Sequence, residues 1–125
     1  MSDSNSPTVL VVDDELFFRE ILKKMLADSG FKVVSEACDG AEAVQKYSET
    51  KPALVLMDIY MSAISGIEAT KEIMAINPSA KIIICSGTGY DDDIAAALAA
   101  GAKAVIFKPF YDEEVLETLR NVLAS

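Results

Sequence analysis

The sequence predicts an α/β fold in which a five-stranded parallel sheet carries helices on both faces. Short apolar runs alternate along the chain with segments whose apolar residues recur at helical spacing. The runs are apolar at consecutive positions, which is typical of strands buried on both faces of a parallel sheet. Because strand and helix alternate throughout, right-handed crossovers should join the strands and produce a three-layer sandwich, (βα)5.

The predicted strands share a high content of β-branched and aliphatic residues. They are Thr8–Val12, Phe31–Ala37, Ala53–Met57, Lys81–Cys85 and Ala104–Phe107. The second run is more polar than the first.

Capping and stop residues set the predicted ends of the helices. The first helix carries an apolar stripe and ends before Gly30, where a left-handed stop favours glycine. Asp39 should cap a second helix that runs through about Ser48. The remaining starts and stops are Gly66 to Asn77-Pro78, Asp91–Asp93 to Gly101, and Asp112 to the end of the chain.

Length and composition indicate one globular domain. The 125 residues are 51% hydrophobic and 25% charged, which suits a single core. We expect residues 1–7 to be a flexible tail and residues 8–125 to be the domain. The chain has no run of about 20 apolar residues and no apolar signal region near its start, so we expect a cytoplasmic protein that does not span a membrane.

Charge and residue content exclude several classes of function. The net charge is −9 and there is no Lys/Arg run, so nucleic acid is not an expected partner. The absence of histidine excludes Ser-His-Asp and Cys-His catalysis, and the chain cannot donate a phosphoryl group from a histidine. Cys38 and Cys85 lie in or beside apolar runs, and we expect both to be reduced thiols in the core.

Polar side chains collect at the carboxyl ends of the predicted inner strands. Asp13 and Asp14 follow the first strand, Asp58 the third, Ser86 the fourth and Lys108 the fifth. Each has an ordinary explanation on its own, as a helix cap, a turn residue or a surface lysine. Ligands bind in the crevice outside the carboxyl ends of such sheets, where all five side chains would meet.

Three carboxylates in one crevice repel one another. A pair about 4 Å apart costs roughly 4 kcal/mol at an effective dielectric of about 20. Either some of these groups stay protonated with raised pKa values, or a divalent cation lies among them, and oxygen ligands in an open cleft favour Mg²⁺. A carboxylate nucleophile with Mg²⁺, a lysine and a hydroxyl suits phosphoryl transfer through an aspartyl phosphate.

Four segments carry a resemblance to a known family. VVDDE at 11–15, LMDIYMSAISG at 56–66, CSG at 85–87 and FKPF at 107–110 resemble the receiver domain of two-component response regulators. The length is most similar to the single-domain chemotaxis regulators of that family. The resemblance implies a flavodoxin-like sheet with strand order 2-1-3-4-5.

The resemblance also implies a role for each site residue. Asp58 would be the phosphoacceptor, beside Ser86 as the switch hydroxyl and Lys108 as the partner of the phosphoryl group. The implied Mg²⁺ ligands are Asp14, Asp58 and the backbone carbonyl of Tyr60, and Asp13 would orient a metal-bound water.

The implied function is signalling rather than turnover of a substrate. A sensor histidine kinase or phosphotransfer protein would supply the phosphoryl group. Output would pass to a downstream protein through the fourth helix, the fifth strand and the fifth helix. Self-phosphorylation and autodephosphorylation would be the only activities.

Several positions depart from the usual pattern of the family. Ser62 replaces a frequent proline, so the loop after Asp58 would be less rigid. Tyr60 and Thr88 are expected to modulate the access of water to the phosphoryl group. Val105 replaces the usual aromatic residue, so output would not depend on an aromatic rotamer and would run through Ser86 and the loop 87–90; a simple role in strand packing is the alternative.

Three other residues have weaker expectations. Arg19 occupies the position of a frequent family arginine without an expected chemical role. Phe110 and Tyr111 are either contacts for a partner or apolar anchors into the core.

Three other functions stay open. A phosphatase of the haloacid-dehalogenase type would need an Asp-x-Asp pair, whereas Asp13 and Asp14 are adjacent. A flavin or nucleotide binder would need a glycine-rich phosphate loop, which the sequence lacks. The third is a receiver that has lost phosphorylation and acts only as an interaction module, against which the full set of acidic, hydroxyl and lysine positions argues.

Overall fold

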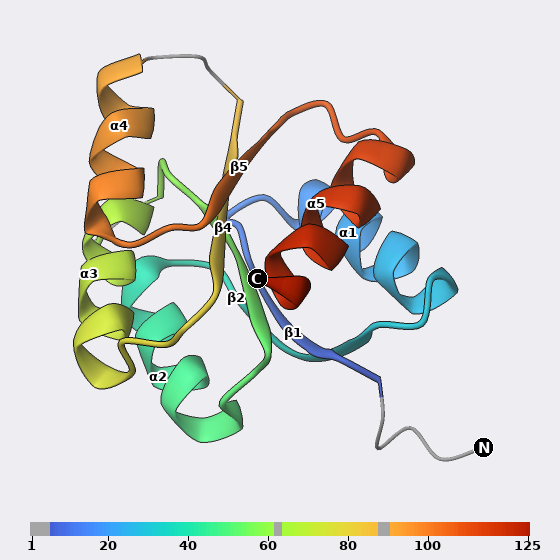
Figure 1. Ribbon diagram of the computed structural model, residues 1–125, viewed down its shortest axis with the longest axis horizontal. Coiled ribbons are helices and arrows are strands. Elements are labelled where there is room, and N and C mark those ends of the chain that lie inside the picture. Colours follow the sequence, from blue (N-terminus) through green and yellow to red (C-terminus); the bar gives the residue numbers. More distant parts are fainter. Residues whose placement is uncertain (1–5, 62–63, 88–90) are drawn as a thin grey trace.

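The chain forms a five-stranded parallel sheet between two layers of helices (Figure 1). The computed structural model describes residues 6–61, 64–87 and 91–125. The strands are β1 (Thr8–Val12), β2 (Lys32–Ala37), β3 (Leu54–Asp58), β4 (Ile82–Ser86) and β5 (Ala104–Phe107). The helices are α1 (Leu16–Asp28), α2 (Gly40–Thr50), α3 (Gly66–Ile76), α4 (Asp91–Ala100) and α5 (Asp112–Ala124). The strand order is β2-β1-β3-β4-β5, which confirms the predicted topology.

Each face of the sheet has its own apolar core. Helices α1 and α5 cover one face, and α2, α3 and α4 cover the other (Figure 1). Successive residues of β1 alternate between the two cores, with Leu10 and Val12 on the α2–α4 side and Val9 and Val11 on the α1–α5 side. A strand covered on both sides has to be apolar at every position, which is the pattern that predicted the fold.

Strand ends differ from the prediction by one residue at the two central strands. Asp58 and Ser86 are the last residues of β3 and β4 rather than the first residues after them. Both are held in the sheet by pairing, because Asp58 lies opposite Cys85 and Ser86 lies opposite Phe107. Their side chains therefore extend from residues of the sheet and not from a loop.

Helix ends follow the local signals that the sequence carries. Gly30 adopts a positive φ of 85° after α1. The Asp39 side chain caps α2 by accepting a hydrogen bond of 2.8 Å from the Glu42 amide. Ser65 caps α3 in the same way, by accepting a hydrogen bond from the Glu68 amide, and this cap was not predicted from the sequence.

The prediction that both cysteines lie in the core is wrong for Cys38. Cys85 is buried in β4, whereas Cys38 is exposed. Cys38 lies in the turn between β2, an edge strand, and α2, and its amide donates a hydrogen bond of 2.7 Å to the carboxylate of Glu42 in α2. An apolar run on one side does not bury the residue that leaves the sheet.

No helix within the described ranges combines the length and the apolar character that a membrane crossing requires.

Candidate functional site

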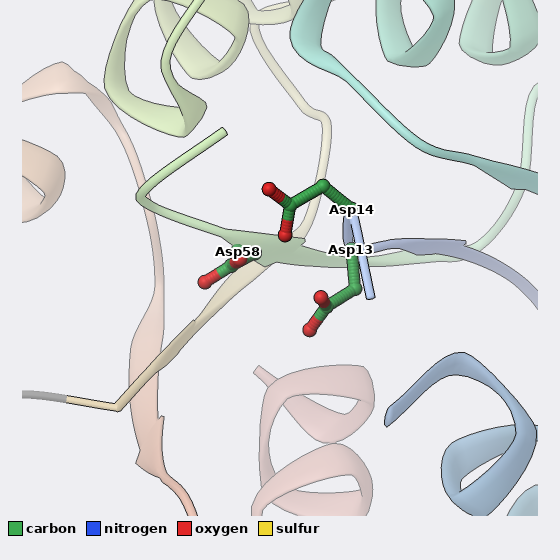
Figure 2. A group of neighbouring side chains, drawn as sticks. All are labelled: Asp13, Asp14 and Asp58. Carbon is green, nitrogen blue, oxygen red and sulfur yellow. The ribbon is translucent and has the colours of Figure 1, made fainter. Parts of the chain in front are cut away.

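The predicted acidic residues meet at the carboxyl ends of β1 and β3. One carboxylate oxygen each from Asp13, Asp14 and Asp58 lies within 4.8 Å of the others. Figure 2 shows the three carboxyl groups gathered over these strand ends. Asp13 and Asp58 are almost fully buried, at 1% and 4% exposed, and Asp14 is exposed. Two negative groups are thus withdrawn from water while the third faces it.

Asp13 is held through its main chain and its side chain. Its amide donates to the carbonyl of Ala37 at 3.1 Å, which ties the end of β1 to β2. Its Oδ1 accepts a hydrogen bond of 2.9 Å from the Glu15 amide, and its Oδ2 lies 2.9 Å from Nζ of Lys108. Its carbonyl oxygen accepts a hydrogen bond of 2.7 Å from Arg19. Such a residue is fixed before any ligand arrives.

Lys108 brings the single ammonium group that the sequence predicts at this edge. Its amide donates to the Ser86 carbonyl at 2.8 Å, which ties the end of β5 to the end of β4. Its Nζ lies 3.6 Å from Oδ1 of Asp58 and 4.1 Å from the centre of the Phe18 ring. The Phe18 ring in turn meets Phe110 edge-on at 5.7 Å. An ammonium between two carboxylates and an aromatic face has little freedom to leave.

The electrostatics of the site show an excess of negative charge. Burial, as the largest cause, and the charges of Asp13 and Asp14 together raise the pKa of Asp58 to about 6, against the opposing charge of Lys108. Burial lowers the pKa of Lys108, but its contact with Asp13 and the charge of Asp58 outweigh this effect and raise it overall. Lys108 is therefore charged at neutral pH, and one positive charge does not balance three carboxylates.

The donor set fits a hard divalent cation. Three carboxylate oxygens within 4.8 Å of one another match the oxygen ligands that Mg²⁺ takes from proteins. Asp14 leaves the site open to water, which suits an ion that keeps several water ligands. A cation here would also offset the charges of Asp13 and Asp14, which add to the effect of burial on the pKa of Asp58.

Gly66 permits the close approach of α3 to the end of β3. A Cβ atom on Gly66 would lie 1.9 Å from the carbonyl oxygen of Asp58, so any other residue would displace this strand end. The amide of Gly66 also donates to the carbonyl of Ile59 at 2.8 Å. The sequence identified Gly66 only as the start of a helix, because the contact joins residues that the loop brings together.

Arg19 lies closer to the site than the sequence implied. Its Nη1 bonds to the Asp13 carbonyl, and its Nε bonds to Oε1 of Glu36 in β2 at 2.9 Å. A basic residue six positions after Asp13 is a weak signal, since nothing in the sequence states which way its side chain turns.

Tyr60 lies at the rim of the site. Its side chain is 45% exposed, and its hydroxyl donates a hydrogen bond to the Asp93 carboxylate in α4. A shallow pocket at this rim contains Asp58 and Lys108. Its lining residues are Glu15, Phe18, Asp58, Tyr60, Gly87, Lys108 and Pro109. Ser62, Thr88 and the loop 88–90, about which the sequence carries expectations, lie outside the described residues.

Three residues in and after β5, about which the sequence carries expectations, differ in their burial. Val105 is half-buried and packs against the core on the α2–α4 side. Phe110 packs against the opposite core and Phe18, so of the two expectations it follows that of an anchor. Tyr111 is 66% exposed and is therefore not an apolar anchor into the core.

Comparison with known proteins identifies the family of this site. The model of the response regulator receiver domain matches residues 9–120. The chain is 49% identical over 114 residues to the chemotaxis protein CheY of Thermotoga maritima, covering 91% of this chain and 95% of that protein. It is 47% identical over 115 residues to CheY of Bacillus subtilis, covering 92% and 96%.

Solved structures agree with the sequence relatives. In a complex of CheX with CheY, BeF₃ and Mg²⁺ from Borrelia burgdorferi, a chain is 33% identical with a TM-score of 0.90, and the match covers 96% of this chain and 92% of that one. The response regulator domain of T. maritima CheB is 36% identical with a TM-score of 0.89, covering 97% and 98%. This chain belongs to the response regulator receiver domain family and is a CheY-like receiver. Receiver domains are signalling modules and not enzymes in the ordinary sense.

Proposed function

We propose that this protein receives a phosphoryl group on the carboxylate of Asp58 and signals by binding another protein in its phosphorylated form. The carrying observation is the placement of that carboxylate. It ends an inner strand, is 4% exposed, lies 3.6 Å from the Lys108 ammonium, and shares a 4.8 Å cluster with Asp13 and Asp14. A buried carboxylate between a cation site and a lysine is a prepared nucleophile.

The transfer exchanges one bond to phosphorus for another. An Oδ atom of Asp58 attacks the phosphorus of a phosphohistidine on a sensor kinase or phosphotransfer protein, and the P–N bond breaks. The electron pair leaves with the imidazole nitrogen, which is then protonated. In the reverse half of the cycle, water attacks the phosphorus, the P–O bond to Asp58 breaks, and inorganic phosphate leaves. In self-phosphorylation from acetyl phosphate, the same oxygen attacks the phosphorus, the P–O bond to the acetyl group breaks, and acetate leaves.

The surrounding side chains act on the phosphoryl oxygens. Lys108, already between Asp13 and Asp58, would pair with one oxygen of the transferred group. The Ser86 hydroxyl, at the buried end of β4, would donate a hydrogen bond to another. The electrostatic attraction of the Lys108 ammonium is stronger here than it would be in water, because the carboxylates that it faces are buried.

A bound Mg²⁺ would neutralise charge on the phosphoryl oxygens and on the carboxylates. The residues proposed to hold it are Asp14, Asp58 and the backbone carbonyl of Tyr60. Asp13 would orient a metal-bound water through the carboxylate that Lys108 and the Glu15 amide already fix. These roles agree with the openness of Asp14 and the rigidity of Asp13.

Output is proposed to run through the surface formed by α4, β5 and α5. Large apolar side chains are exposed along it: Leu98 at 44%, Phe107 at 45% and Tyr111 at 66%. Because Val105 has no ring to reorient, the change would pass from Ser86 through the following loop to this surface. The relatives named as chemotaxis proteins support a cytoplasmic, chemotaxis-type pathway, and the acidic charge of −9 favours a protein partner over nucleic acid.

The test is the intact mass of the protein after treatment with acetyl phosphate. The wild type should gain the mass of one phosphoryl group with Mg²⁺ and none with EDTA, and Asp58→Asn should gain none. Lys108→Met should bind Mg²⁺ but retain less of the phosphoryl group. A wild type that gains no mass with Mg²⁺ would instead be an interaction module that has lost phosphorylation.

A further inference from the structure

The side chain of Arg19 joins three elements beside the acidic cluster. It leaves α1 one turn after the helix begins and is 16% exposed. Its Nη1 donates to the carbonyl oxygen of Asp13 at 2.7 Å, and its Nε donates to Oε1 of Glu36 in β2 at 2.9 Å. One planar guanidinium group in α1 therefore links the residue that follows β1 to the neighbouring strand β2.

The bond to Asp13 acts on a peptide group that matters for the cation site. The Asp13 carbonyl belongs to the planar peptide unit that also contains the amide of Asp14. A hydrogen bond to that carbonyl therefore fixes the orientation of the peptide plane between Asp13 and Asp14, and with it the direction in which the Asp14 side chain leaves the backbone. Asp14 is the exposed member of the acidic cluster, so burial does not position its carboxylate as it does those of Asp13 and Asp58.

The guanidinium is itself held from the far side. The second carboxylate oxygen of Glu36 lies 2.8 Å from Nζ of Lys23, which also lies 3.0 Å from Glu20. Contacts with Lys23 and Arg19 lower the pKa of Glu36 despite partial burial, so this carboxylate is ionised at neutral pH. Arg19 is consequently held by a charged partner in an orientation that reaches the Asp13 carbonyl.

We infer that Arg19 is a positioning residue for the cation site, because it fixes the Asp13–Asp14 peptide so that the Asp14 carboxylate stands beside that of Asp58. This inference rests on the proposed function, since it concerns the affinity of the same site for Mg²⁺. Arg19 touches neither the cation nor the phosphoryl group. Its effect passes through one main-chain carbonyl.

Positioning and simple charge make opposite predictions for Arg19. A positive charge close to a cation site repels the cation, so removing it should tighten binding if charge alone matters. If Arg19 orients Asp14, removing it should weaken binding although the site becomes more negative. Mutation of a residue that orients a metal ligand typically lowers the metal affinity by 10- to 100-fold. Because Asp14 is exposed, we expect a loss at the lower end of this range, about tenfold.

The experiment is a titration of each full-length variant with MgCl₂, followed by amide chemical shifts in ¹H–¹⁵N spectra. Arg19→Gln should weaken Mg²⁺ binding by about tenfold. Arg19→Lys should also weaken it, because a single ammonium does not reproduce the two directed bonds. Arg120→Gln is the matched control, since it removes the only other arginine, which is exposed in α5, and should leave the affinity within about twofold.

The outcomes separate this inference from the proposed function. Unchanged or tighter Mg²⁺ binding by Arg19→Gln, with wild-type binding intact, overturns the positioning role and leaves the proposed function standing. A wild type that binds no Mg²⁺ overturns both. If Arg19→Gln does not fold, Arg19→Lys decides the question, because it keeps the positive charge and loses the two directed bonds. A loss of Mg²⁺ affinity in that variant then supports the role, and no loss overturns it.

Discussion

Replacing Asp58 with asparagine should stabilise the protein when no divalent cation is present. Asparagine is nearly the same size as aspartate and removes a charge that burial and the neighbouring Asp13 and Asp14 destabilise. The pKa of Asp58 is raised from its ordinary value of 3.8 to about 6. At about 1.4 kcal/mol for each pH unit, this difference corresponds to an upper limit of about 3 kcal/mol in the free energy of unfolding. The raised pKa already includes the opposing attraction of Lys108, so we expect a gain of about 1–3 kcal/mol at pH 8.

The sign of the pH dependence follows from the direction of the shift. The folded protein binds a proton at Asp58 more tightly than the unfolded chain, so the wild type is penalised fully above the folded pKa of about 6. As the pH falls from about 6 towards 3.8, the penalty disappears. The advantage of the asparagine variant should therefore be full at pH 8 and nearly absent at pH 4.

The assay is urea unfolding followed by far-UV circular dichroism in EDTA at several pH values, and again with Mg²⁺. Mg²⁺ should stabilise the wild type more than the variant, because it binds the folded site and offsets the repulsion. Asp28→Asn, which removes an exposed carboxylate at the end of α1, should change the stability by less than about 0.5 kcal/mol. An asparagine variant that is equal to or less stable than the wild type at pH 8 in EDTA would refute the electrostatic reasoning.

Three further perturbations test other parts of the structure. Gly66→Ala should lower the free energy of unfolding by more than about 2 kcal/mol in urea titrations, because its Cβ would meet the Asp58 carbonyl at 1.9 Å. Gly87→Ala is its control, since that Cβ would lie 3.7 Å from Lys108 Cδ, and an equal loss in both would contradict the packing argument. Tyr60→Ala should speed the loss of the phosphoryl group by roughly two- to tenfold in a phosphate-release assay, because the ring at the rim would no longer restrict water; Tyr60→Phe isolates the bond to Asp93, and an unchanged rate in the alanine variant would disprove the shielding role. A thiol reagent should label Cys38 in the native protein and Cys85 only after unfolding, so that native labelling of neither or both would contradict the exposure of Cys38 and the burial of Cys85.

The fold was predictable because its signals are local. Continuous apolar runs need cover on both faces, and Gly30 and Asp39 mark helix ends through their own backbone and side-chain preferences. The strand order came from the resemblance, because apolar content does not state which strand lies next to which. The end of β3 moved by one residue for the same reason, since pairing of Asp58 with Cys85 keeps Asp58 in the sheet.

The sequence predicted which residues form the site, but it did not predict the contacts that hold them in place. Parallel strands bring their carboxyl ends to one edge, so Asp13, Asp58 and Lys108 were expected to meet there. The contacts that hold them join residues whose relation depends on how helices pack. Arg19 reaches back across its own loop to Asp13, and Gly66 touches the strand that precedes its helix.

The sequence by itself determined the class of this protein, because doubly apolar strands alternate with helices and the motifs at the strand ends resemble those of receiver domains. The tertiary structure alone decided which carboxylates are withdrawn from water, and hence that the pKa of Asp58 rises to about 6. It also decided that Cys38 is exposed and that Arg19 is tied to the site. Burial and side-chain direction depend on neighbours that are distant along the chain, and these neighbours are assembled only when the helices close over the sheet.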